Sequence, residues 1–292
     1  MINKKIVFTG PPDVGKTTIK KVFFDHTSPV SLLKNPLQPS RGVNSRVYST
    51  FNFYLGIFDL AGQENKNWFS NKGKDVFTES NIIICVFDIR NTLESIIQFL
   101  MGIYKLKKEL HLNSCQIIAF LHKIDLRSNS YVNQKLKIIQ NFISIQHPQG
   151  KNFKIYKTSI TIDYFYNTYY IISEILNLIY QRNLTSVDDQ EFQKLKKELS
   201  IIFNLKINFI YNITDLVHKF KFNSEDLKNH IERLEKLGFI KVFDKNQFFK
   251  LTDSANYFKV GLEKEFTIID EIHFNKRIEL FHIFLCFKEK EV

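Results

Sequence analysis

The sequence predicts a two-domain α/β protein in which a mostly parallel six-stranded sheet, with helices on both faces, precedes a smaller α+β domain. The chain has 292 residues and 44% of them are hydrophobic, which is enough to build two cores. Short apolar runs alternate with longer helical patterns from residue 4 to about 182, and this alternation is typical of a parallel sheet. A polar segment at 183–190 then separates two regions of different pattern, so we expect domains at 1–184 and 185–292.

The first region supplies the strands and helices of the predicted sheet. Several of its apolar runs lack polar residues almost entirely, as strands covered on both faces do. We expect strands at 5–9, 51–58, 82–87, 116–121 and 154–157, and helices at 17–24, 92–112, 132–145 and 164–180.

The second region has the element order of a winged helix. Apolar residues at helical spacing predict helices around 192–202, 214–220 and 224–237, the last opened by Ser224 as N-cap and closed by Gly238. Two strands at 239–243 and 247–251 follow, joined by a turn at 244–246.

A glycine-rich segment between the first strand and the first helix matches the pattern G-x-x-x-x-G-K-[ST] at residues 10–17. In such a loop, backbone N–H groups and the helix N-terminus surround phosphate oxygens. A lysine adds charge at the β and γ phosphates, and a hydroxyl binds Mg²⁺. We therefore expect a nucleotide's phosphates to contact Gly10, Asp13, Val14, Gly15, Lys16, Thr17 and Thr18.

A second motif, D-x-x-G-Q, stands at the end of the strand predicted at 51–58. Asp59 is placed to hold Mg²⁺ through water, and the backbone N–H of Gly62 to approach the γ-phosphate. Gln63 is then the candidate catalytic residue, because its amide can orient a hydrolytic water.

These motifs, together with two later ones, resemble the Ras-like small GTPases. The later motifs are His122-Lys123-Ile124-Asp125, again at a strand end, and Thr158-Ser159-Ile160. The histidine in place of asparagine is similar to the Rag type in particular. The resemblance implies the P-loop GTPase fold, binding of GTP and GDP with Mg²⁺, and a guanine site formed by His122, Lys123, Asp125, Ser159 and Ile160.

The third magnesium-binding residue is expected at Ser40. The segment Pro39-Ser40-Arg41-Gly42 resembles the Pro-Thr-x-Gly segment of Arf-like GTPases, with serine retaining the hydroxyl. The expected metal ligands are thus Thr17, Ser40 and Asp59, with a surface turn as the alternative for Ser40.

Hydrolysis is expected to be slow without a partner. Gln63 can place the water, but the transferred phosphoryl group usually needs an arginine from the chain or from an activating protein. Arg41 and Arg46 both follow Ser40, whereas the arginine that acts within Gα proteins precedes the equivalent threonine. We expect a GTPase-activating protein as partner, with a nucleotide-bound scaffold that hardly hydrolyses GTP as the alternative.

The net charge of +11 falls entirely in residues 1–184, which hold 23 Lys and Arg against 12 Asp and Glu. Residues 185–292 hold 18 of each, and the third predicted helix is slightly acidic, which disfavours DNA. We therefore expect the second domain to bind protein effectors or to form a homo- or heterodimer, with a GTP-controlled DNA-binding regulator as the alternative. The basic first domain suits an acidic partner or peripheral contact with an anionic membrane. No apolar run is long enough to span a membrane, so we expect a cytoplasmic protein.

Overall fold

A computed structural model describes residues 2–50, 53–146, 153–180, 189–220, 222–243, 247–266 and 288–289. The chain divides into two compact units. The first comprises Met1–Lys20, Leu37–Ser159 and Phe287–Val292, and the second comprises Lys21–Pro36 and Ile160–Cys286.

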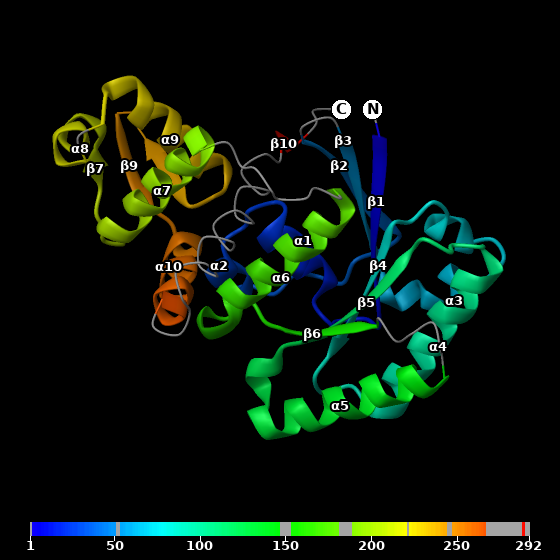
Figure 1. Cartoon of the computed structure of the whole chain (residues 1–292). Helices are drawn as coiled ribbons and strands as arrows, with labels where there is room; N and C mark the ends of the chain where they lie inside the picture. Colours follow the sequence, from blue (N-terminus) through cyan, green and yellow to red (C-terminus); the bar gives the residue numbers. More distant parts are fainter. Residues whose placement is uncertain are drawn as a thin grey trace. The chain divides into compact units, whose positions relative to one another are not determined.

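The first unit is built on one mixed sheet of order β10-β2-β3-β1-β4-β5-β6 (Figure 1). Strands β3, β1, β4, β5 and β6 are mutually parallel, and β2 and β10 are added antiparallel at one edge. Six strands from residues 2–158 therefore form the predicted sheet, and β10 adds a seventh. Their bounds are β1 Ile2–Thr9, β2 Val43–Thr50, β3 Phe53–Leu60, β4 Ile82–Asp88, β5 Gln116–His122, β6 Lys154–Thr158 and β10 Lys288–Glu289.

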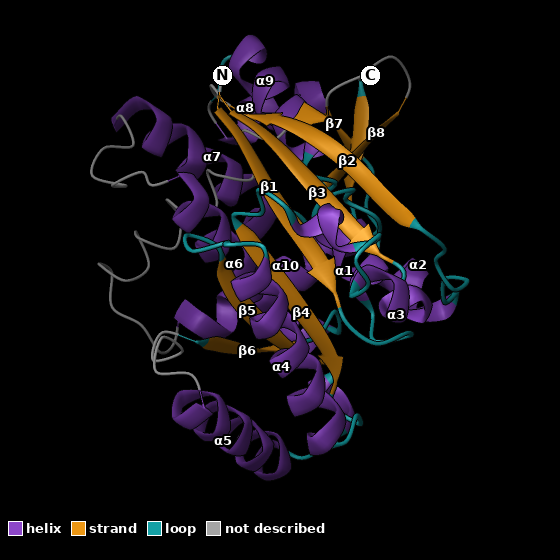
Figure 2. Ribbon diagram, turned by 90° about the vertical axis from the view of Figure 1, so that its right-hand side faces the viewer, coloured by secondary structure: helices purple, strands orange, loops and turns teal. Residues whose placement is uncertain are grey.

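The interior strands are apolar because both of their faces are covered. Every residue of β4 is buried, as are all residues of β5 after Gln116. Helix α4 (Leu93–Glu109) turns Ile96, Leu100 and Ile103 inward at helical spacing, and the Thr92 hydroxyl caps its first turn. Figure 2 shows the orange strands running side by side among the helices. The other helical segments of this part are α1 Lys16–Phe23, η1 Gly62–Glu64, α3 Asn65–Trp68, η2 Lys74–Phe77, η3 Ile124–Leu126 and α5 Asn129–Gln146.

The second unit combines a helical layer with a small antiparallel sheet of order β7-β9-β8. Helix α6 packs on α10 through aromatic rings: the centroid of Phe258 lies 5.3 Å from those of Tyr166 and Tyr169. Rings packed edge to face in this way add to the stabilisation from burial. The elements are α2 Pro29–Lys34, α6 Ile162–Tyr180, α7 Asp189–Asn204, β7 Tyr211–Asn212, α8 Ile213–Phe220, α9 Ser224–Lys236, β8 Ile240–Phe243, β9 Phe248–Leu251 and α10 Asp253–Phe266.

The predicted order of three helices and a hairpin is present as α7, α8, α9, β8 and β9. The predicted N-cap is wrong by one residue: the side chain of Asn223, not Ser224, accepts the N–H of Asp226 at 2.8 Å. Gly238 follows α9 with a φ of 69°, as expected for a glycine that ends a helix. The predicted turn at 244–246, the boundary segment 183–188 and most of the chain after 266 lie outside the described residues.

None of the described helices combines the length and the apolar content that crossing a membrane requires.

Candidate functional site

The predicted site residues follow the carboxyl ends of parallel strands. The phosphate loop follows β1, Asp59 lies near the end of β3, and His122 ends β5. Because parallel strands end at the same edge of a sheet, these segments meet there, and this edge is where α/β sheets bind ligands.

Lys16 is fixed beneath the phosphate loop. Its side chain is 6% exposed, and its ammonium group donates to the carbonyl oxygens of Gly10 at 3.0 Å and Pro11 at 2.7 Å. Burial lowers the pKa of Lys16 to about 8, although the carboxylates of Asp59 and Asp13 oppose the shift. The loop therefore holds a desolvated cation where a phosphate would approach.

The remaining predicted phosphate-loop residues differ in exposure. Val14 is buried at 1% exposure, whereas Asp13 is exposed and adopts a φ of 58°. Thr18 is half-buried on α1.

The His122 ring covers Gly15. Gly15 has a φ of 99°, and a Cβ atom there would lie 2.8 Å from Cδ2 of His122, so no side chain fits without displacing the ring. His122 is 2% exposed, and its Nδ1 lies 3.0 Å from Oγ1 of Thr158. Burial, followed by the charge of Lys123, lowers the pKa of His122 to about 3, so the imidazole is neutral. This neutral ring connects β5 to the phosphate loop.

Three oxygen-bearing side chains from separate segments meet beside the phosphate loop. The Thr17 hydroxyl donates to Oδ2 of Asp59 at 2.6 Å, and its oxygen lies 2.8 Å from that of Ser40. Asp59 is 1% exposed. Two hydroxyls and one carboxylate form a hard, all-oxygen donor set, so the residues present fit Mg²⁺.

The segment after Asp59 lies directly against the phosphate loop. A Cβ atom on Gly62 would lie 2.5 Å from backbone atoms of Pro11 and Pro12, so this approach requires glycine. The Asn65 amide also donates to the Gly10 carbonyl at 3.1 Å. Gln63, in contrast, is exposed, and no hydrogen bond joins its side chain to the other site residues that the structure describes.

Two further contacts order this segment. The carboxylate of Glu64 accepts the backbone N–H of Gly42 at 2.7 Å and so connects the segment to the residues after Ser40. The indole N–H of the half-buried Trp68 donates to the carbonyl of Ala61 at 2.9 Å.

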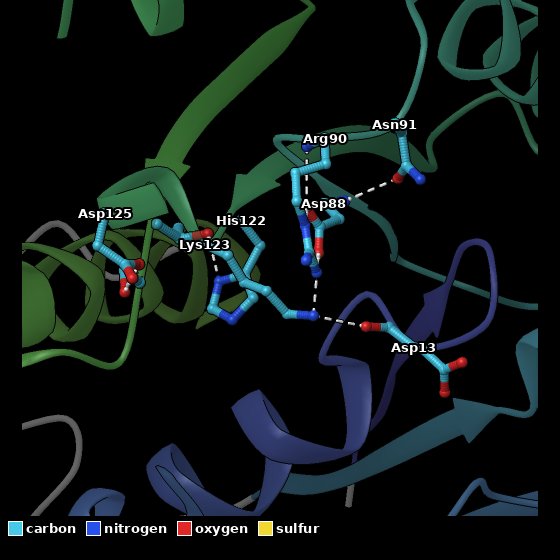
Figure 3. Close-up of polar contacts among 9 residues, drawn as sticks. Asp13, Asp88, Arg90, Asn91, His122, Lys123 and Asp125 are labelled. Carbon is cyan, nitrogen blue, oxygen red and sulfur yellow. Dashed lines mark hydrogen bonds and ion pairs between the residues drawn. The ribbon is translucent and has the colours of Figure 1, made fainter. Parts of the chain in front are cut away.

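The residues predicted to bind the base occupy the loops after β5 and β6. The Ser159 hydroxyl donates to Oδ1 of the exposed Asp125 at 2.5 Å, and Ser159 itself is 2% exposed. The Lys123 ammonium donates to the backbone carbonyl of Asp13 at 2.6 Å (Figure 3). Ile160 is buried and belongs to the second compact unit.

Asp88 is a site residue that the sequence interpretation missed. It ends β4, and its carboxylate lies 2.9 Å from the ammonium of Lys123. The available signal was a carboxylate at the end of a buried strand, the same signal that identified Asp59. Asn65 and Glu64 were also missed, and no motif singles them out.

A phosphate loop, an all-oxygen cluster beside it and an aspartate on the loop after β5 together define a P-loop nucleotide-binding protein of the G-protein class. A family model described as the Gtr1/RagA G protein conserved region matches residues 5–211, which is 207 of the 292 residues. The chain belongs to the Gtr1/RagA family of G proteins. Membership confirms the resemblance to Rag-type GTPases and implies guanine-nucleotide binding. A search of curated proteins found no match.

Proposed function

We propose that this protein is a GTP-binding regulatory switch that depends on Mg²⁺ and hydrolyses GTP slowly without a partner. The observation that carries this proposal is the meeting, at one sheet edge, of the phosphate loop, the Thr17–Asp59 contact and the Asp125–Ser159 contact in a chain of a G-protein family. Residues near Ser40 and Gly62 would signal to protein effectors whether GTP or GDP is bound.

On the phosphate side, Lys16 would bind the β and γ phosphates, with Gly10, Asp13, Val14, Gly15 and Thr18 shaping the loop around them. Thr17, Ser40 and Asp59 would hold Mg²⁺, which when bound neutralises charge on the phosphate oxygens. Gly62 lies against the phosphate loop, which suits a backbone N–H that senses the γ-phosphate.

On the base side, Asp125 would accept two hydrogen bonds from the N1–H and the exocyclic amine of guanine, which adenine does not offer. Lys123 would lay its stem across the base, with His122, Ser159 and Ile160 completing the site.

The test of this assignment is the nucleotide that the protein binds. We expect guanine nucleotide to co-purify with the protein, and Asp125→Asn to shift the preference from guanine to xanthine nucleotides. The shift is expected because the asparagine amide can donate to the oxygen that xanthine carries in place of the exocyclic amine. Adenine nucleotide in the purified protein, or no change in preference, would contradict the assignment.

The exposure of Gln63 favours a second candidate function, a nucleotide-bound scaffold with little hydrolysis. In the switch proposal Gln63 orients the attacking water once a GTPase-activating protein orders the segment around it. Single-turnover hydrolysis distinguishes the two candidates. If the protein is a switch, Gln63→Leu should hydrolyse GTP more slowly than the unaltered protein. Equal hydrolysis rates for the two would show that Gln63 is not catalytic and would favour the scaffold.

For the second domain, which we place at 185–292 and interpret as a winged helix, we propose protein contacts. Helix α9 carries three basic residues against four acidic ones, and its Arg233 is also paired with the buried carboxylate of Glu198 at 3.1 Å. A recognition helix with its arginine used internally is poorly suited to DNA. Dimerisation with a like or related G protein, and effector docking, are the roles that this surface supports best. The basic first domain, at 1–184, would favour an acidic partner or an anionic membrane surface.

A further inference from the structure

Asp88 lies between the candidate base-binding loop and the loop after β4. It is the last residue of β4, and its side chain is 6% exposed. We propose that Asp88 is a positioning residue for Lys123: it fixes the lysine so that its stem is ready to receive the guanine base. The inference rests on the proposed function and deepens it.

The geometry consists of one ammonium group held from two sides. Nζ of Lys123 lies 2.9 Å from Oδ2 of Asp88 and 2.6 Å from the backbone carbonyl of Asp13 (Figure 3). Lys123 also adopts a φ of 58°, a left-handed conformation that persists for a lysine only where its surroundings hold it. Lys123 thus connects the ends of β4 and β5 to the phosphate loop.

Asp88 is itself held rigidly. Arg90 donates to both of its carboxylate oxygens, from Nε at 2.9 Å and from a terminal nitrogen at 2.8 Å, and the Arg90 backbone N–H adds a third bond at 2.9 Å. The Asp88 backbone N–H donates to the Asn91 side chain at 2.8 Å. Burial opposes the charged form of Asp88, but hydrogen bonds from Arg90 and Lys123 outweigh it and hold the pKa of the carboxyl well below its ordinary value.

A buried lysine on α5 fixes the same loop from its other side. The Lys135 ammonium donates to the carbonyl of Ile89 at 2.7 Å and to that of Asn91. Asp88 therefore precedes a loop that is held both by its own hydrogen bonds and by Lys135 of α5.

The physical reason for such a residue is the flexibility of lysine. A lysine side chain has many rotamers, and ordering it on binding would subtract from nucleotide affinity. The Lys123 side chain is 29% exposed, so without Asp88 its ammonium would be drawn toward solvent. Because both ends of the Lys123 stem are already fixed in the folded protein, nucleotide binding does not have to order this side chain.

Asp88 acts through Lys123 in this account, so its removal should change how tightly a nucleotide is held and not which base is chosen. Asp125 reads the edge of the base, whereas the Lys123 stem covers its face. Loss of Asp88 is therefore expected to lower the affinity for guanine nucleotides and the affinity for xanthine nucleotides by the same factor.

The experiment measures GDP dissociation with a fluorescent GDP analogue from the full-length protein with Mg²⁺. We expect Asp88→Asn to raise the dissociation rate about tenfold, the equivalent of one lost interaction near 1.4 kcal/mol. Lys123→Met should raise it at least as much, and adding Asp88→Asn to Lys123→Met should change nothing further. Arg90→Met removes the side-chain bonds that hold Asp88 but leaves the contact of Asp88 with Lys123, so it should raise the rate less than Asp88→Asn does. The matched control is Glu109→Gln, which changes a 44% exposed carboxylate paired with Lys105 at 3.9 Å at the end of α4; we expect a change below about twofold.

Each outcome decides between the claims. If the unaltered protein binds no guanine nucleotide, the proposed function and this inference both fail. If it binds GDP but Asp88→Asn and Lys123→Met act additively, or Asp88→Asn leaves dissociation unchanged, only the role of Asp88 is overturned. If Asp88→Asn does not fold, Asp88→Glu takes its place, because it retains the charge and should give a smaller increase that also vanishes with Lys123→Met.

Discussion

At the scale of the residue, the buried ammonium of Lys16 sets how nucleotide affinity should depend on pH. Burial lowers the pKa of Lys16 from an ordinary value of 10.5 to about 8 in the nucleotide-free protein. A phosphate beside Lys16 would raise that pKa again, so nucleotide binding above about pH 8 must take up a proton. The affinity of the protein for nucleotide is therefore expected to fall as the pH rises through this value.

The first prediction is a loss of affinity for Mg–GDP above about pH 8, approaching tenfold per pH unit at most. Isothermal titration calorimetry between pH 7 and pH 9 measures the dissociation constant, and buffers of different ionisation enthalpy report the proton uptake. Lys16→Arg is the control, because arginine stays charged and any titration of the nucleotide itself affects both proteins equally. Equal slopes for the two proteins would show that Lys16 does not titrate in this range.

The sequence singled out the candidate site residues that belong to motifs, because their spacing and their position after strands carry the chemistry. Thr17, Ser40 and Asp59 come together although 42 positions separate the first from the last, as the resemblance implied. It did not predict that the His122 ring would cover Gly15, because a contact between two loops depends on the side-chain geometry of both.

Asp88 shows a different limit. A strand-ending aspartate was visible in the sequence, but its partner Lys123 lies 35 positions away and already had an assigned role (123 minus 88). Only the register of β4 beside β5, which pairs Asp88 with His122, brings the two loops together.

At the scale of the element, helices with a strong apolar period were predicted to within a few residues, whereas β2, α2 and α10 were not predicted. Strand β2 pairs with β3 on one side and only with the two-residue β10 on the other, and it is rich in polar residues. It therefore lacks the apolar run that marks β4. Helix α2 has only six residues and starts at a proline, and a helix of that length carries too few turns for a period to be recognised. Helix α10 was missed although its buried Ala255, Phe258 and Leu262 stand at helical spacing.

Helices α7 and α9 are joined by a buried ionic cluster. Oε1 of Glu198 lies 3.0 Å from Nδ1 of His230 and 3.1 Å from Nε of Arg233, and Glu198 is fully buried. A buried carboxylate depends on such partners, because Glu198 is not hydrated in the folded protein.

The second prediction is that Glu198→Ala lowers the free energy of unfolding by about 3–5 kcal/mol, as removal of one member of a buried ionic cluster typically does. Urea unfolding followed by circular dichroism measures the loss, and hydrogen exchange should show faster exchange in α7 and α9. The control is Glu263→Ala, which removes a half-exposed partner lying 4.0 Å from Lys259 and should cost less than about 1 kcal/mol. Equal effects of the two substitutions would show that the cluster does not hold α7 to α9.

At the scale of the whole molecule, the charge and the chemistry fall in the same part of the chain. All of the surplus of +11 lies in residues 1–184, where 23 basic residues face 12 acidic ones, and this part also contains every motif of the site. One lysine of a phosphate loop accounts for little of that surplus, which is the reason for proposing an acidic partner or an anionic surface. Residues 185–292 have no net charge, which agrees with a role in protein contacts.

The third prediction concerns whether the second domain responds to the nucleotide. A switch whose output domain reports its state must show changes in both regions between the GDP-bound form and the form bound to a non-hydrolysable GTP analogue. Hydrogen exchange of the full-length protein should differ at 37–46 and 59–70, and also in α7, α8 or α9. The chain has one tryptophan, Trp68, which lies in the second of these loops, so intrinsic fluorescence should report the same transition.

Two controls make this prediction specific. Trp68→Phe should abolish the fluorescence change while leaving the exchange differences in place, because it removes only the reporter and its bond to Ala61. Asp125→Asn loaded with xanthine nucleotides should reproduce the exchange differences and so exclude an effect of the analogue alone. Differences confined to 37–46 and 59–70 would mean that the second domain serves as a constant docking surface, since a domain with no differential interaction with the two states cannot report them.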